Sequence, residues 1–149
     1  MTLEARITQY CDDLTFSAID PAALEIASRS LLDALGVSLA GARDEGVKVL
    51  AGIVEQWGGQ PQSRVLGRQQ ALPAPAAAML NGAAARVLDF DDVADPLGTH
   101  PSVAILPPLL AIADLVDKPI DRQAFITAFV IGQDLSIRLS RARKETLLE

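Results

Sequence analysis

The chain has 149 residues, of which half are hydrophobic but only 4% are aromatic, and its formal net charge is −6. A chain of this length forms one domain by default, and its long runs of Ala, Leu, Val and Ile favour packed helices over sheets. The net negative charge argues against sequence-independent binding to nucleic acid and against binding to anionic membranes. The single cysteine, Cys11, excludes an intrachain disulfide.

Helices are predicted through the first third of the chain. A short helix over residues 3–14 is followed by a long one from Pro21 to about residue 40, because Asp20 is a good N-cap and proline is tolerated in a first turn. Gly36 in the middle of that helix costs roughly 1 kcal/mol against alanine, so we expect another helix to approach closely there. Asp44 should cap a third helix.

The middle of the chain changes pattern and then returns to helix. Residues 60–72 predict a small extended excursion, with a two-stranded ribbon as one form. The alanine-rich run at 76–88 carries small residues on nearly every face, so it predicts a central helix surrounded by others. The next helix must begin at or after Pro101, and Asp121 should cap a last helix that ends near residue 143.

These elements predict a single all-α domain over residues 1–149, a bundle of about six helices with a small extended excursion. Several helices are apolar on more than one face, so we expect a homo-oligomer or a second chain that supplies the rest of the fold. The N-terminus lacks the layout of a signal peptide, and the longest apolar run, 103–113, is too short to span a bilayer. The expected location is therefore the cytoplasm, without membrane association.

One stretch carries more charge than a packed core needs. Four aspartates and the only histidine fall within twelve residues, between two apolar segments: Asp89, Asp91, Asp92, Asp95 and His100. The stretch is either a solvated loop whose acids cap helix ends, or a carboxylate and imidazole cluster for general acid-base chemistry at the rim of the core. Residue types alone leave both interpretations open.

Other chemistries fit this stretch less well. A calcium-binding EF-hand loop counted from Asp89 needs glycine at its sixth position and glutamate at its twelfth, where this chain has Ala94 and His100. One histidine among aspartates is thin support for another divalent metal. Ser102 lies near His100, but the sequence has neither a Gly-x-Ser-x-Gly elbow nor a glycine-rich phosphate loop. We therefore expect no metal and no cofactor.

Several motifs have a familiar spacing. They are Leu-Leu-Asp-Ala-Leu-Gly-Val-Ser-Leu-Ala-Gly at 31–41, Asn-Gly-Ala at 81–83, Leu-Asp-Phe-Asp-Asp at 88–92, and Thr-His-Pro-Ser at 99–102. Together they resemble the 2-methylcitrate dehydratase family, also called the MmgE/PrpD superfamily. The resemblance covers essentially the whole chain and corresponds to the N-terminal part of that family's helical domain.

The resemblance implies a lyase that acts on a small carboxylic acid without an organic cofactor. Known activities of the family are dehydration of 2-methylcitrate, decarboxylation of cis-aconitate and epimerisation of iminodisuccinate. By position, Asp89 and His100 match the family's active-site aspartate and histidine, and Asp92 belongs to the same motif. We add Thr99 and Ser102 as predicted substrate-binding residues. A hydro-lyase is the first expectation, with a decarboxylase or an epimerase as alternatives.

The chain departs from the family in two ways. Where the family usually has threonine after Asp-Asp, this chain has Val93, followed by Ala94 and Asp95, which puts one polar contact to substrate in doubt. Family chains are also several times longer and carry a downstream lysine, a tyrosine and second-domain residues in the site. We therefore expect the chain alone to be inactive. The alternative is a non-catalytic helical module for dimerisation or partner binding.

Overall fold

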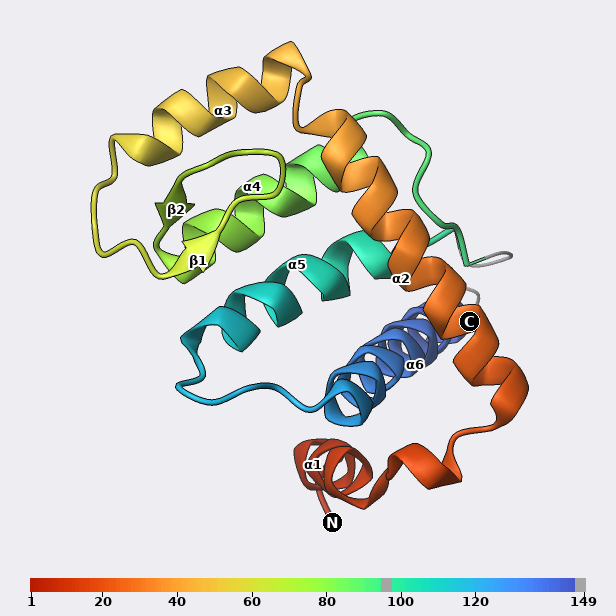
Figure 1. Ribbon diagram of the computed structural model, residues 1–149. Coiled ribbons are helices and arrows are strands. Elements are labelled where there is room, and N and C mark those ends of the chain that lie inside the picture. Colours follow the sequence, from red (N-terminus) through yellow and green to blue (C-terminus); the bar gives the residue numbers. More distant parts are fainter. Residues whose placement is uncertain (95–97, 147–149) are drawn as a thin grey trace.

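The computed structural model describes residues 1–94 and 98–146, with side chains up to residue 143 in the last helix (Figure 1). Within these residues, six α-helices and one two-stranded ribbon confirm the predicted all-α bundle with a small extended excursion. The elements are α1 (Leu3–Asp13), a short 3-10 turn η1 (Phe16–Ala18), α2 (Pro21–Gly41), α3 (Glu45–Glu55), β1 (Ser63–Arg64), β2 (Ala71–Leu72), α4 (Ala74–Arg86), α5 (Pro101–Leu115) and α6 (Arg122–Thr146).

Three helices begin at an aspartate, as the sequence predicts. Asp20, Asp44 and Asp121 precede α2, α3 and α6, and each carboxylate accepts a hydrogen bond from a backbone N–H in the first turn. The donors are Ala22, Gly46 and Ala124, at 2.7, 2.8 and 2.8 Å. Because the first amides of a helix have no partner within it, these caps fix where the helices start.

Helix α4 runs beside α5 and is crossed by α2 near its C-terminal end, and with these two helices it makes its most extensive contacts (Figure 1). Its buried residues are mostly alanines, which lets both neighbouring helices approach closely. The buried set is Ala74, Ala76, Ala77, Leu80, Asn81, Ala84 and Ala85. The prediction of a surrounded, alanine-rich helix holds for these packed faces, whereas Pro75, Met79 and Arg86 of the same helix are exposed.

The close approach of α2 to another helix occurs at Gly41 rather than at Gly36. A Cβ added at Gly36 would meet nothing within 4 Å, so the predicted contact there is wrong. A Cβ added at Gly41 would lie 2.0 Å from the carbonyl oxygen of Ala84 and 2.9 Å from the Cγ1 atom of Val87. The glycine that packing requires therefore sits where the end of α2 crosses the last turn of α4.

Helix α5 begins at Pro101, as the sequence predicts, and continues past Pro107 and Pro108 without a break. It packs along α4, where Gly82 faces it: a Cβ at that position would lie 3.5 Å from the carbonyl oxygen of Val103. The pairing of α4 with α5 places the C-terminal end of one helix beside the N-terminal end of the other (Figure 1). The segment that joins these two ends contains the acidic stretch.

The surplus of apolar residues predicted from the sequence appears as exposed side chains on the outer helices. Large exposed examples on α2 and just after α3 are Ile26, Leu32 and Trp57, which are 65%, 74% and 62% exposed. Tryptophan side chains are mostly buried on average, so the high exposure of Trp57 is unusual. Over the described residues, no helix combines the length and hydropathy needed to cross a membrane.

Candidate functional site

The acidic loop, residues 89–100, starts with a tight turn after α4. The backbone N–H of Asp89 donates to the carbonyl oxygen of Arg86 at 3.0 Å, and Asp89 adopts a left-handed conformation with φ of 57°. Few residues other than glycine adopt this conformation, but aspartate is among those that do so most readily. The turn leads the chain back toward the start of α5, so that Asp91 and Asp92 meet residues of that helix and its N-cap.

Asp91 lies at the centre of the site. Its side chain is fully buried, and one carboxylate oxygen, Oδ1, accepts a hydrogen bond from Nη1 of Arg86 at 3.0 Å. The other oxygen, Oδ2, lies 2.9 Å from Nδ1 of His100. The N–H of that imidazole is not aligned for a hydrogen bond, and among the described residues neither atom has another hydrogen-bond partner. A buried carboxylate needs compensating charge, which the guanidinium of Arg86 supplies.

His100 is the N-cap residue of α5, and its side chain is 26% exposed. Because Nδ1 is buried against Asp91, the other ring nitrogen, Nε2, is the one left to meet a reactant. A carboxylate that accepts a hydrogen bond from one imidazole nitrogen can fix the orientation of the ring, and here the two atoms are 2.9 Å apart although the N–H is not aligned. The arrangement can therefore accept and return a proton at Nε2.

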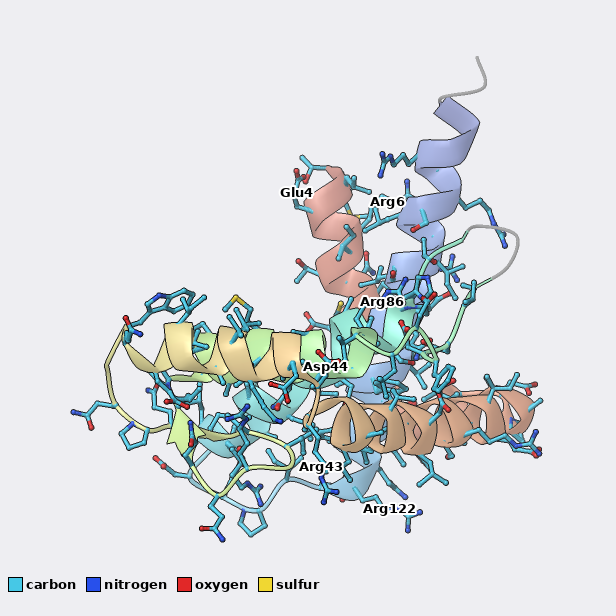
Figure 2. All side chains as sticks on the ribbon, turned by 90° about the horizontal axis from the view of Figure 1, so that it is seen from above. Glu4, Arg6, Arg43, Asp44, Arg86 and Arg122 are labelled. Atoms are coloured by element: carbon cyan, nitrogen blue, oxygen red, sulfur yellow. The ribbon has the colours of Figure 1, made fainter. Side chains whose placement is uncertain are left out.

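Arg86, which is labelled in Figure 2, lies at the C-terminal end of α4 and pairs with two of the aspartates. Besides Asp91, its guanidinium pairs with Asp89, whose side chain is 77% exposed while that of Arg86 is 44% exposed. The hydrogen bond from Arg86 lowers the pKa of Asp89, and the same bond raises the pKa of Arg86. Within the described residues, Asp89 forms its ion pair with Arg86, and it is Asp91 that contacts His100.

Asp92 and Ser102 fasten the loop to two helices. The carboxylate of Asp92 accepts from the Ser102 backbone N–H at 3.1 Å and from its hydroxyl at 2.5 Å. Gln133 of α6 donates to the same hydroxyl oxygen at 2.7 Å, and Ser102 is only 1% exposed. All these contacts are internal and position the start of α5. The catalytic role of Asp92 and the substrate contact of Ser102 stay predictions.

Thr99 closes the loop next to His100. Its carbonyl oxygen accepts from the backbone N–H of Ala94 at 2.8 Å, which pairs the two strands of the loop. Its hydroxyl is buried and has no hydrogen-bond partner among the described residues, so a substrate contact there stays a prediction. Val93 is 57% exposed, and Asp95 lies outside the described residues.

Three residues that the sequence analysis did not select contribute to the site. Asp91 was counted in the acidic cluster without a catalytic role, and Arg86 and Gln133 were not considered. The spacing of Arg86, three residues before Asp89 at the end of a predicted helix, is a signal that could have indicated an ion pair. For Gln133 the sequence offers no such signal, because it lies 31 residues from its partner.

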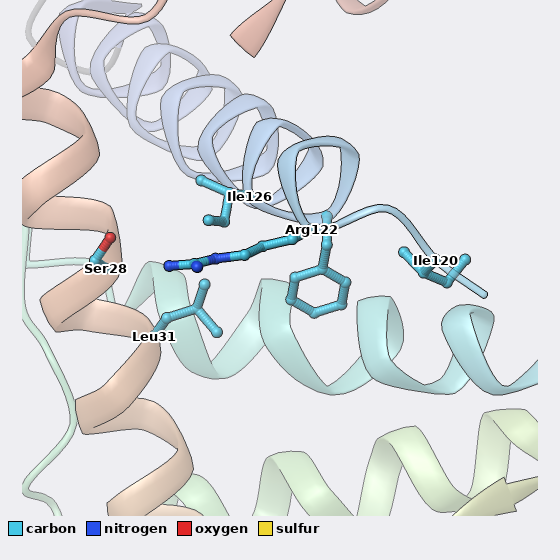
Figure 3. A pocket seen from close by; sticks show the side chains of 6 residues that line it. Ser28, Leu31, Ile120, Arg122 and Ile126 are labelled. Carbon is cyan, nitrogen blue, oxygen red and sulfur yellow. The ribbon is translucent and has the colours of Figure 1, made fainter.

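Within the part of the chain that the structure describes, several cavities are lined without any of the predicted site residues. One of about 410 Å³ opens between α2 and the start of α6 (Figure 3), and it is lined by Ser28, Leu31, Ile120, Arg122, Phe125 and Ile126. None of the predicted site residues lines it. In the part of the chain that the structure describes, no three His, Cys, Asp or Glu side chains are grouped to hold a metal ion. The acidic loop connects α4 to α5, and its described part does not contribute to the lining of this cavity.

Comparison with known proteins agrees with these motifs. Residues 5–146 match the family described as MmgE/PrpD N-terminal domain. The cis-aconitate decarboxylase of Mus musculus is 33% identical over 122 residues, which cover 80% of this chain and 25% of that protein. The Homo sapiens cis-aconitate decarboxylase is 31% identical over 125 residues, or 82% and 26%. The chain spans about a quarter of the length of these curated relatives. It belongs to the MmgE/PrpD family, of which it represents the N-terminal domain.

Proposed function

We propose that this chain contributes the proton-transfer half of a lyase active site that acts on a small carboxylic acid. The observation that carries the proposal is the buried Asp91 carboxylate set 2.9 Å behind His100, whose imidazole is still 26% exposed. Membership of the MmgE/PrpD family supports the same chemistry, because two relatives are named as decarboxylases. No cofactor enters the proposed step.

In the hydro-lyase form of the reaction, Nε2 of His100 removes a proton from the carbon beside a substrate carboxylate. The electron pair of that C–H bond forms the new double bond, and the hydroxyl on the neighbouring carbon takes up a proton and leaves as water. Asp91 stabilises the imidazolium that forms. Asp89 and Asp92, which match the family's motif, are proposed as further members of the site.

Decarboxylation is the second candidate, and the names of the two relatives favour it. In this form the bond between the carbon and the carboxylate breaks, carbon dioxide leaves, and the electron pair stays on the carbon. The imidazolium of His100 then delivers a proton to that carbon. An epimerase of the same family would remove and return a proton at one carbon. All three reactions use the same imidazole beside the same carboxylate.

We also propose that the active form contains more protein than these 149 residues. A multiply charged acid next to four aspartates needs cationic groups, and Arg86 is the one cation paired with the described part of the loop. Exposed apolar side chains on α2 and α3 offer surface that a second copy or a chain completing the fold would cover. The native mass in solution tests this directly.

The test of the function uses the chain alone and together with a protein that spans the rest of the family's fold. Each sample is given 2-methylcitrate and cis-aconitate in deuterated water, and the products are identified by NMR. His100→Gln should lower turnover by about 10²- to 10⁴-fold, the usual contribution of a general acid-base group. The thermal midpoint of the variant controls for folding. An assembled sample whose turnover is unaffected by His100→Gln would refute the assignment.

A non-catalytic module is the alternative from another functional class. The exposed Val93, at a place where the resemblance leads us to expect a polar residue, favours it. A tight complex with no turnover of either acid, in any combination of chains, would support the module over the enzyme. Turnover that depends on His100 would exclude it.

A further inference from the structure

Arg86 holds two carboxylates that differ in how firmly they are bound. Its partner Asp91 has a fully buried side chain, whereas its partner Asp89 is 77% exposed. The guanidinium itself is 44% exposed, so part of it faces solvent. One cation thus bridges the interior of the site and the water outside.

The ion pair of Arg86 with Asp91 costs more free energy to break than the ion pair of Arg86 with Asp89. Without Arg86, the Asp91 carboxylate would be buried with only the imidazole of His100 beside it, so this pair is held in place. The Asp89 pair is between exposed side chains, where water and salt weaken the attraction. An anion from solution can therefore compete with Asp89 for Arg86 but not with Asp91.

The position of Arg86 suits a substrate carboxylate. Arg86 and His100 contact opposite oxygens of the same Asp91 carboxylate, so an anion on the outer side of the guanidinium would be one side chain away from the imidazole. A guanidinium presents parallel N–H groups that match the two oxygens of a carboxylate. Among the described residues, no lysine and no second arginine is paired with the acidic loop.

We propose that Arg86 is the subsite for a substrate carboxylate, and that Asp89 occupies this subsite when no substrate is bound. The inference rests on the proposed function, which supplies the class of ligand. Binding exchanges one carboxylate for another on the guanidinium and leaves the Asp91 contact unchanged. Asp89 is then released from Arg86 beside the bound acid.

The exchange predicts opposite effects for the two partners. In a calorimetric titration with cis-aconitate at low salt, Asp89→Asn should tighten binding by about 3- to 10-fold, because the internal competitor loses its charge. Arg86→Gln should weaken binding by about tenfold or more, since charge-assisted hydrogen bonds are lost. Arg86→Lys keeps the charge without the paired N–H groups and should fall between the wild type and Arg86→Gln.

The chain offers a control on α2, where Arg29 and Glu25 form an exposed pair at 2.5 Å. Glu25→Gln and Arg29→Gln make the same charge changes outside the loop, and each should alter binding by less than about twofold. Thermal midpoints of all variants are measured in parallel. Since Arg86→Gln strips a buried carboxylate of its cation, Arg86→Lys provides the comparison if that variant unfolds.

Three outcomes would overturn the subsite. These are binding by Arg86→Gln and Arg86→Lys at wild-type affinity, weaker binding by Asp89→Asn, and the absence of saturable binding to both the chain and its assembled form. Binding is measured without turnover, so this result is distinguishable from the His100 test. If cis-aconitate binds through Arg86 but turnover does not depend on His100, the proposed subsite stands and the proposed reaction is refuted.

Discussion

Two non-helical segments attach to the paired helices α4 and α5, one near each end, and they use polar residues differently (Figure 1). The ribbon, residues 63–72, is fastened by one polar side chain from each helix, although Nε of Arg68 is buried without a hydrogen-bond partner among the described residues. Asn81 of α4 accepts from the N–H of Leu66 at 2.8 Å and donates to the carbonyl oxygen of Arg64 at 3.1 Å. Asp114 of α5 accepts from Ser63 and from both the backbone and the guanidinium of Arg64.

The acidic loop at the other end keeps several groups incompletely bonded. Oδ2 of Asp91 and Nδ1 of His100 lie together without an aligned hydrogen bond, and the hydroxyl of Thr99 has no partner among the described residues. Asp89 holds a left-handed backbone conformation that most residues avoid. Buried polar groups are usually satisfied, and exceptions gather at functional sites. Among the described residues, the acidic loop thus holds three buried polar atoms without a hydrogen-bond partner, whereas the ribbon holds one.

The largest change in stability is expected where the fold sets the position of the acidic loop. Gly41→Ala would place a Cβ 2.0 Å from the carbonyl oxygen of Ala84, in the last turns of α4 before the loop. Overpacking of this kind lowers the free energy of unfolding by about 1–3 kcal/mol or more. The clash is with the backbone of α4, which cannot move aside as the end of a flexible side chain could. Urea unfolding should show the loss.

Gly36→Ala in the same helix is the matched control, because an added methyl there meets nothing within 4 Å. It should stabilise the protein by about 0.5–1 kcal/mol through helix propensity alone. Equal effects of the two substitutions would mean that α2 does not press on α4 at Gly41, and the placement of the loop would need another explanation.

Asp114→Asn is the second substitution and tests the ribbon. It neutralises a carboxylate that accepts hydrogen bonds from the hydroxyl of Ser63 and from the backbone and guanidinium of Arg64, so the free energy of unfolding should fall by about 1–3 kcal/mol. Turnover should change little, because Asp114 lies at the end of α5 away from His100. A variant that keeps full stability would show that the ribbon is held by Asn81 and apolar packing instead.

The same residue predicts a pH dependence. The Arg64 guanidinium holds the pKa of Asp114 below its ordinary value of 3.8 in the folded chain. A lowered pKa in the folded state contributes stability that is present above pH 3.8 and is lost as the pH falls through the lower, folded value. Acid unfolding curves of the wild type should therefore contain a component in that window which Asp114→Asn lacks.

Much of the fold follows from local chemistry in the sequence. The N-caps at Asp20, Asp44 and Asp121 and the small residues of α4 depend on neighbours along the chain, and the structure confirms them. The extended excursion follows in the same way from a loss of helical pattern. Such features need no knowledge of which helix packs on which.

The features that escaped prediction depend on contacts between distant residues. Gly36 and Gly41 both lie in the sequence of one helix, and only the crossing of α2 over α4 distinguishes them. Asp89 and Asp91 are both acids in one cluster, but the left-handed turn at Asp89 decides that Asp91 is the one buried against His100. The residue types in the sequence indicate acid-base chemistry, but only tertiary packing shows which aspartate lies next to His100.

Asp91→Asn should have the smallest effect on stability, less than about 1 kcal/mol, because the amide keeps an oxygen for Arg86 and no unpaired buried charge remains. Turnover should nevertheless fall by about 10²-fold or more. The amide nitrogen would face Nδ1 of His100 as a donor, so the imidazole would carry its proton on Nε2 and could not accept one there. Asp114→Asn should show the reverse, a loss of stability with turnover retained. Measuring both quantities for both variants tests whether the two ends of the α4 and α5 pair differ as their hydrogen bonds indicate, and a parallel loss of stability in both would show that Asp91 is structural too.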